Sequence, residues 1–210
     1  MAADDSVPAI PRSLLARLRA DPSRAPEHLA LAAAQAHGPA ARDWLAERTS
    51  RYAATSRELA LMAKQRHASL ARMGGAAGGV GGFVTLVPDL AAAVWIQSRL
   101  IYFVAAAYGF DPLDPMRPAE QLVLQGLYET PFEARAALDG AGKHVAVAVA
   151  ESGLRSEETL ARRLVTMLGR HGARHLVGRF IPFVGVPLNA IGHERETRAL
   201  ADRAIQFYGG

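Results

Sequence analysis

The sequence RMGGAAGGVGGFVTLVPD, residues 72–89, decides the fold together with the apolar run from Leu90 to Tyr108 that follows it. Asp89 is the only charged residue between Arg72 and Arg99. A stretch of this length with a single charge has to be buried in a protein core or placed against lipid. We therefore expect the rest of the chain to be arranged around it.

The glycines of this stretch repeat at helical spacing. Gly74, Gly78 and Gly82 are four residues apart, so on a helix they would form a face without side chains. Such a face allows another backbone, or a flat ligand, to approach closely. These three glycines and the following Phe83 are therefore predicted to line a lipid- or ligand-binding site.

The apolar run predicts a helix that starts at Leu90 and ends at Gly109, with Asp89 as its N-cap. Nineteen residues span about 28 Å, nearly the thickness of a bilayer core. Arg99 would lie near its middle, which costs about 2.5 to 3.5 kcal/mol on insertion scales. A buried or re-entrant helix is therefore favoured over a transmembrane span. Asp89 and Arg99 are interpreted as a cap and a structural ion pair, or as an acid beside a buried base in a pocket. Both are also candidate lipid- or ligand-binding residues.

The composition indicates one globular domain. The chain has 210 residues, half of them hydrophobic, and no cysteine, which excludes disulfides, thiolate metal sites and cysteine nucleophiles. Its start carries Asp4 and Asp5 and lacks a basic segment followed by an apolar run, so no secretory signal is predicted. We expect cytoplasmic residence, with the protein peripheral at the membrane.

Arginine supplies 22 of the 24 basic residues, and two regions concentrate them. The segments 42–72 and 155–179 each carry a net charge of +4, and each leads into an apolar stretch marked by glycine and proline. This arrangement is typical of surfaces that bind anionic phospholipid, although solvated helix faces have the same pattern. The candidates for headgroup contacts are Arg57, Lys64, Arg66, Arg72, Arg170, Arg174 and Arg179.

A second apolar segment, FIPFVGVPLNAI at residues 180–191, resembles the first. Phe183-Val184 precedes Val186-Pro187 much as Phe83-Val84 precedes Val87-Pro88, which suggests a degenerate internal repeat that forms two apolar helical hairpins. Phe180, Phe183 and Asn189 are therefore added to the candidate ligand-binding residues.

Apolar periodicity and helix boundary signals predict an all-α, single-domain bundle of many helices that contains these two hairpins. Residues 1–39 are expected to form short N-terminal helices and 40–210 the main helical domain. The predicted helices cover 11–20, 26 to a stop at Gly38-Pro39, 40–73 with a break near Thr55-Ser56, 119–128, 131–138, 143–151, a basic helix from Ser156 and 189–208.

Several of these motifs together resemble the EcsC family of bacterial proteins. The resemblance rests on the glycines 74–82, the Pro88-Asp89-Leu90 turn, the helix end at 107–112, the segment 180–185 with Asn189, and Thr197-Arg198. It covers residues 60–208 and implies an α-helical, membrane-proximal protein. No biochemical activity is implied, and Pro187 departs from the smoother small-residue run of the family.

Enzyme chemistry has weaker signals. His171 and His175 are four residues apart, with His193, Glu194 and Glu196 as possible further metal ligands, but the His-Glu-x-x-His spacing is missing. The glycines are not followed by Gly-Lys-Ser/Thr, which argues against a nucleotide site, and no helix-turn-helix spacing supports nucleic-acid binding.

The favoured hypothesis is a lipid- or membrane-associated accessory protein that binds anionic phospholipid or encloses an acyl chain in a hydrophobic cavity, without catalysis or cofactor. A membrane protein complex is a further possible partner. The alternatives are a hydrolase that uses Asp89 or a histidine-based metal site, and a soluble interaction module.

Overall fold

The structure is a computed structural model that describes residues 9–77, 83–140, 156–168 and 190–210. Within these ranges it is entirely helical, without strands, and its eight α-helices pack as a single bundle. The predicted all-α class is therefore confirmed. The helices are α1 (Arg12–Ala20), α2 (Ala25–Arg51), α3 (Ser56–Ala77), α4 (Phe83–Ala107), α5 (Arg117–Leu124), α6 (Pro131–Leu138), α7 (Ser156–Met167) and α9 (Ala190–Gly209), with a 3-10 turn at Pro22–Arg24.

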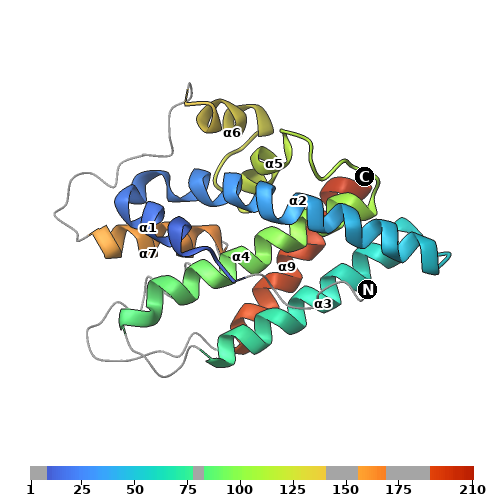
Figure 1. Cartoon of the computed structure of the whole chain (residues 1–210), viewed down its shortest axis with the longest axis horizontal. Helices are drawn as coiled ribbons and strands as arrows, with labels where there is room; N and C mark the ends of the chain where they lie inside the picture. Colours follow the sequence, from blue (N-terminus) through green and yellow to red (C-terminus); the bar gives the residue numbers. More distant parts are fainter. Residues whose placement is uncertain (1–8, 78–82, 141–155, 169–189) are drawn as a thin grey trace.

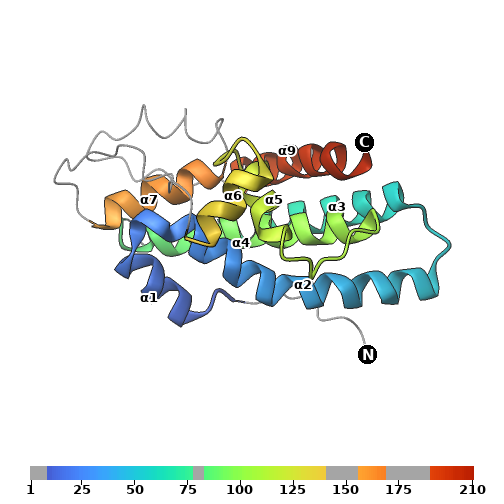
Figure 2. The ribbon, with the colours of Figure 1, turned by 90° about the horizontal axis from the view of Figure 1, so that it is seen from above.

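Helix α4 lies at the centre of the bundle. Figure 1 shows it between α2 and α3, and the view in Figure 2 adds α7 and α9 along another side. In the described part of the chain, its segment Val87–Ala107 is the one helix long and apolar enough to cross a bilayer, with a mean hydropathy of 1.5, and 94% of it is buried. The apolar run is therefore the core helix of the bundle in this structure.

Helix α4 begins earlier than the sequence suggested. It starts at Phe83 and contains Pro88, so Asp89 lies inside the helix and the predicted N-cap at this residue is wrong. An interior proline removes one backbone hydrogen bond and costs about 3 kcal/mol. Burial of Val87 and Leu90 on either side of the proline offsets that cost. The predicted end is confirmed, because Gly109 adopts a positive φ of 83° directly after the helix.

Helices α3 and α4 pack against each other and are joined by residues 78–82, so the two arms of the first predicted hairpin are present. The second predicted hairpin, residues 180–191, lies outside the described residues, as does the predicted helix 143–151.

Helix α2 continues through Gly38-Pro39 to Arg51, so the predicted helix end at this dipeptide is wrong. Gly38 does not end the helix; it allows the backbone at Pro112 to pack closely against α2. A Cβ atom at this position would lie 2.8 Å from the carbonyl oxygen of Pro112, in the loop that crosses α2 there. The expected boundary between residues 39 and 40 consequently falls within one continuous helix.

The predicted break near Thr55-Ser56 is confirmed, since α2 ends at Arg51 and α3 begins at Ser56. Its cause is a capping box. The Glu58 carboxylate accepts hydrogen bonds from the Thr55 amide and hydroxyl, both at 2.8 Å, and the Thr55 hydroxyl accepts one from the Glu58 amide.

Helix α5 differs in length from expectation, whereas the bounds of α6 and the start of α7 agree with it. Helix α5 is shorter than predicted because Gly126, with φ of 75°, stops it. Helix α6 has the predicted bounds and begins with a capping box between Thr130 and Glu133. Helix α7 begins at Ser156 as predicted and ends at Met167.

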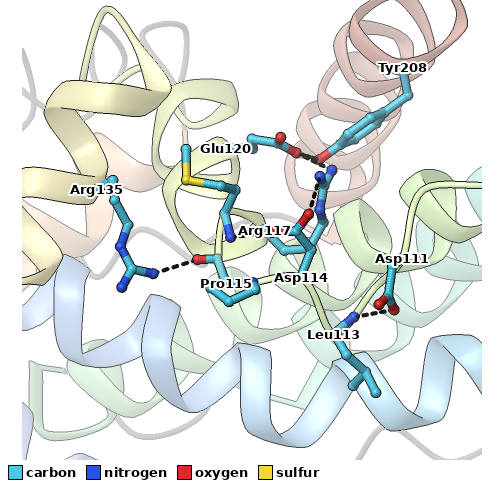
Figure 3. A network of polar contacts seen from close by, with 9 residues as sticks. Asp111, Leu113, Asp114, Pro115, Arg117, Glu120, Arg135 and Tyr208 are labelled. Carbon is cyan, nitrogen blue, oxygen red and sulfur yellow. Dashed lines mark hydrogen bonds and ion pairs between the residues drawn. The ribbon is translucent and has the colours of Figure 1, made fainter.

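A buried polar clamp fastens α5 to the end of α9 (Figure 3). Arg117 forms ion pairs with Glu120 and Asp114, and Glu120 accepts a 2.7 Å hydrogen bond from the Tyr208 hydroxyl. The Arg117 side chain is 7% exposed and lies over the rings of Phe110 and Tyr208. Burial raises the pKa of Glu120, while the hydrogen bond from Tyr208 and the charge of Arg117 act in the opposite direction.

Replacing Gly38 by alanine should lower the free energy of unfolding by about 1–3 kcal/mol, because the new methyl group would collide with the Pro112 backbone. Urea unfolding measures this change. Gly192→Ala is the matched control: a Cβ atom there meets nothing within 4 Å, so this variant should be neutral or gain up to about 1 kcal/mol of helix propensity. Equal free energies of unfolding for the two variants would contradict the close packing of Pro112 against Gly38.

Replacing Arg117 by methionine should destabilise the protein by about 3–5 kcal/mol, because Glu120 would lose its buried counter-ion. Arg135→Met provides the comparison, since Arg135 pairs with Asp139 at the surface and such pairs contribute about 0–1 kcal/mol. Thermal or urea unfolding of both variants distinguishes a structural clamp from a surface contact.

Candidate functional site

The outward face of α3 combines exposed apolar and basic side chains. Helix α3 turns small residues toward α4 and α9, with Ala60, Ala63 and Ala68 fully buried. The opposite side exposes three large apolar residues, whose exposed fractions are 40% for Leu61, 41% for Met62 and 60% for Met73. Arg57 and Arg72 are exposed on the same side. We call the set Arg57, Leu61, Met62, Arg72 and Met73 the α3 face.

This face carries a positive charge. Helix α3 contains four basic residues and one acid, Glu58, a net charge of +3. The carboxylate of Glu58 is engaged in the capping box with Thr55 at the start of the helix. Beyond that first turn, α3 presents no acidic group to solvent.

The predicted headgroup residues of α3 have different environments. Lys64 forms an ion pair with Asp202 of α9, and the Arg66 guanidinium lies 5.9 Å from the centre of the Phe103 ring. Arg72 lies 3.9 Å from the Glu194 carboxylate, a long contact that leaves 60% of its side chain exposed. Lys64 and Arg66 are therefore directed along the bundle, while Arg57 and Arg72 remain on the α3 face.

Asp89 and Arg99 do not form the predicted ion pair. Both belong to the continuous helix α4, and ten residues separate them, a rise of about 15 Å at 1.5 Å per residue. Asp89 acts instead on His193 of α9: burial lowers the pKa of His193, and the negative charge of Asp89 raises it. The structure thus brings Asp89 to α9 and leaves Arg99 in the centre of the bundle.

Arg99 lies in a buried polar cluster between α2, α3 and α4. Its guanidinium stacks 4.8 Å from the centre of the Phe103 ring, and the residue is 4% exposed. His67 packs against the same ring, and its Nδ1 atom lies 2.7 Å from the carbonyl oxygen of Ala63. His37 packs 4.4 Å from the ring centre of Trp95.

Both histidines of this cluster are neutral at physiological pH. Burial lowers the pKa of His37 and of His67 to about 3, and the nearby charge of Arg99 contributes in the same direction. The burial of these two histidines was not predicted from the sequence. It could have been predicted from helical periodicity, because His37 and His67 lie on the apolar sides of their helices, next to fully buried alanines.

A neighbouring network connects α4 to α5. The Gln121 amide donates a 2.8 Å hydrogen bond to the Ser98 hydroxyl, which donates in turn to the Val94 carbonyl oxygen. These hydrogen bonds hold α5 against the core helix α4.

A solvent-open groove of about 270 Å³ separates α1 from α2 and reaches Trp95. The groove is lined by polar side chains such as Arg17 and Gln35 as well as apolar ones such as Leu14. This is a poor match to the hydrophobic cavity expected for an enclosed acyl chain.

The remaining candidate residues fall into two groups. Gly74 lies in the last turns of α3, and Phe83 is the first residue of α4. The others lie outside the described residues: Gly78, Gly82, Arg170, His171, Arg174, His175, Arg179, Phe180, Phe183 and Asn189. Among the residues that are described, no three acidic or histidine side chains come together as a possible metal site.

The two buried histidines predict an acid-labile protein. Their pKa is about 3 in the folded state against 6.5 ordinarily, so between these values the unfolded state binds more protons. The contribution of these two histidines to the free energy of unfolding should therefore be fully present above their unfolded pKa of 6.5 and be lost progressively as the pH decreases toward 3. Urea unfolding at several pH values measures the slope, which should be reduced in His67→Leu. An unchanged slope in that variant would contradict the assignment.

Comparison with protein families shows that residues 31–209 match the EcsC protein family. Searches of curated proteins and of solved structures find no match. The matched region contains α3, α4, α5, α6, α7 and α9, together with most of α2. The match begins earlier than the resemblance, which covers residues 60–208, and includes most of the continuous helix α2. Because the match covers 179 of the 210 residues, this chain belongs to the EcsC protein family.

Proposed function

We propose that the protein binds the surface of anionic membranes through its α3 face. The observation that supports this function is the composition of that face: three exposed apolar side chains with two exposed arginines and no acid beyond the first turn. Interfacial helices combine these features, because apolar groups enter the headgroup region while cations bind anionic lipid.

The spacing along α3 suits a helix that lies flat on a bilayer. Arg57 and Arg72 are fifteen residues apart, which places them about 22 Å apart along the helix axis. Leu61 and Met62 lie between them, and Met73 follows directly after Arg72. Each arginine near an anionic surface contributes about 1 kcal/mol, so the apolar side chains have to supply part of the affinity.

Surface binding agrees better with the position of α4 than insertion does. The segment that resembles a membrane span is 94% buried by its neighbours, and exposing it to lipid would require the bundle to open. A peripheral mode leaves the core intact and uses side chains that are already exposed.

The alternative of a hydrolytic centre is supported by one observation, the influence of the Asp89 charge on the pKa of His193. A carboxylate that raises the pKa of an imidazole is a feature of many general bases. No described group of residues adds a metal site to this pair, so the α3 face remains the better supported site.

Vesicle flotation tests the proposal. The wild-type protein should float with vesicles that contain phosphatidylglycerol or phosphatidylserine and should remain unbound with pure phosphatidylcholine. Raising the salt from about 0.1 M to about 1 M should weaken recovery, because the Debye length falls from about 10 Å to about 3 Å. The double variant Met62→Glu/Met73→Glu should lose at least about tenfold in binding, since it adds two negative charges to the contact.

The control is Leu31→Glu, which also replaces an exposed apolar side chain by glutamate, at a residue of α2 that is 39% exposed. It should float like the wild type, and circular dichroism should show all three proteins folded. Absence of wild-type flotation with anionic vesicles would refute membrane-surface binding. Equal recovery of the α3 variant would place the contact elsewhere on the molecule.

A further inference from the structure

The side of the bundle formed by residues 109–140 is acidic. This segment contains six acidic residues and two arginines, a net charge of −4. Both arginines are already engaged within the segment: Arg117 in the buried clamp, and Arg135 at the surface with Asp139 and the Pro115 carbonyl oxygen. The carboxylates that reach the surface are those of Asp111, Asp114, Glu129, Glu133 and Asp139.

The same side exposes large apolar groups. Phe132, in the first turn of α6, is 81% exposed, the highest value among the large apolar side chains of the described residues. Phe110 and Leu113 are 41% and 42% exposed in the loop that leads to α5. Helix α6 is held next to this loop by the hydrogen bond from Arg135 to Pro115 (Figure 3). We call residues 110–139, with these three apolar side chains, the acidic face.

The acidic face and the α3 face lie on opposite sides of the molecule. In Figure 1, α5 and α6 lie above α2, while α3 lies below α4. The acidic face has a net charge of −4, whereas the α3 face carries the cations Arg57 and Arg72, and each face exposes three large apolar side chains. One molecule therefore cannot bring its own two faces together.

We propose that these two faces bind each other between copies of this chain, the α3 face of one molecule covering the acidic face of the next. Charge complementarity selects the partner, since like faces repel one another, and the exposed apolar side chains supply the desolvated centre of the contact. Because the contact joins two different faces, it does not close a two-fold dimer. It produces a ring or an open chain of molecules.

The contact is small. Three apolar side chains on each side are fewer than a stable interface contains, so association should be weak and should depend strongly on salt. The proposal concerns the same α3 face as the proposed function but does not require lipid binding. Where both occur, anionic membrane and a second copy compete for that face, and vesicles should dissociate the assemblies.

Sedimentation velocity over a range of protein concentrations tests the self-association. The wild type should show a weight-average mass that rises steadily with concentration at about 0.1 M salt and returns to the monomer at about 1 M. Met62→Glu/Met73→Glu, which alters the α3 face, and Glu129→Lys/Phe132→Ser, which alters the acidic face, should each be monomeric. Leu31→Glu should associate like the wild type.

Mixing the two altered proteins gives the decisive result. Each retains one intact face, and the two intact faces are complementary, so the equimolar mixture should form a dimer and nothing larger. A mixture that stays monomeric would overturn the proposal, and so would a wild type that is monomeric at every concentration. Association abolished by only one of the two double variants would indicate a contact between like faces and would equally overturn it.

Flotation of the same proteins separates this inference from the proposed function. Glu129→Lys/Phe132→Ser keeps the α3 face and should still bind anionic vesicles. Self-association of the wild type without flotation would leave the inference standing and remove the membrane proposal, whereas flotation by a strictly monomeric wild type would do the reverse.

Discussion

The structure depends on one constraint, the need to cover an apolar helix from every direction. Helix α4 has no polar stripe, so it cannot lie at a surface with one side in water. Helices α2, α3, α5, α7 and α9 each pack against it, and they come from both ends of the sequence. The largest fully buried side chains include Trp95, Tyr102 and Phe103 of this helix. The need to bury α4 on all sides therefore explains why these helices surround it.

Arginine has three distinct roles in this chain, and composition alone does not separate them. Arg117 is an internal counter-ion, Arg99 and Arg66 stack on an aromatic ring, and Arg57 and Arg72 face solvent. Only the third role contributes to a surface field that a partner can sense. The acidic residues are also unevenly placed, so a net charge of +4 conceals two faces of opposite sign.

The sequence predicted the fold class because long apolar and amphipathic periods identify helices directly, and the confirmed ends at Gly109 and Thr55 follow from local capping chemistry. Two helix boundaries predicted at prolines were wrong, because Pro39 and Pro88 both lie inside helices. Burial of the residues on either side outweighs the one lost backbone hydrogen bond. That burial depends on residues far away in the sequence. The predicted Asp89–Arg99 ion pair was wrong for a related reason: both residues lie in one continuous helix, which keeps them apart. Arg57 and Arg72 of the α3 face were among the predicted headgroup residues, whereas the exposure of Met73 and Phe132 depends on tertiary packing and could not be predicted from the sequence.

The burial of α4 also has a consequence for protein synthesis. Its cover is completed by α9, which ends 102 residues after α4 does. At typical translation rates of about 5–20 residues per second, one side of this helix stays open for about 5–20 s after it leaves the ribosome. During that interval the nascent chain exposes a segment with the length and hydropathy of a membrane span. We therefore expect chaperones and membrane-targeting factors to compete for this segment with the helices that follow it in the chain.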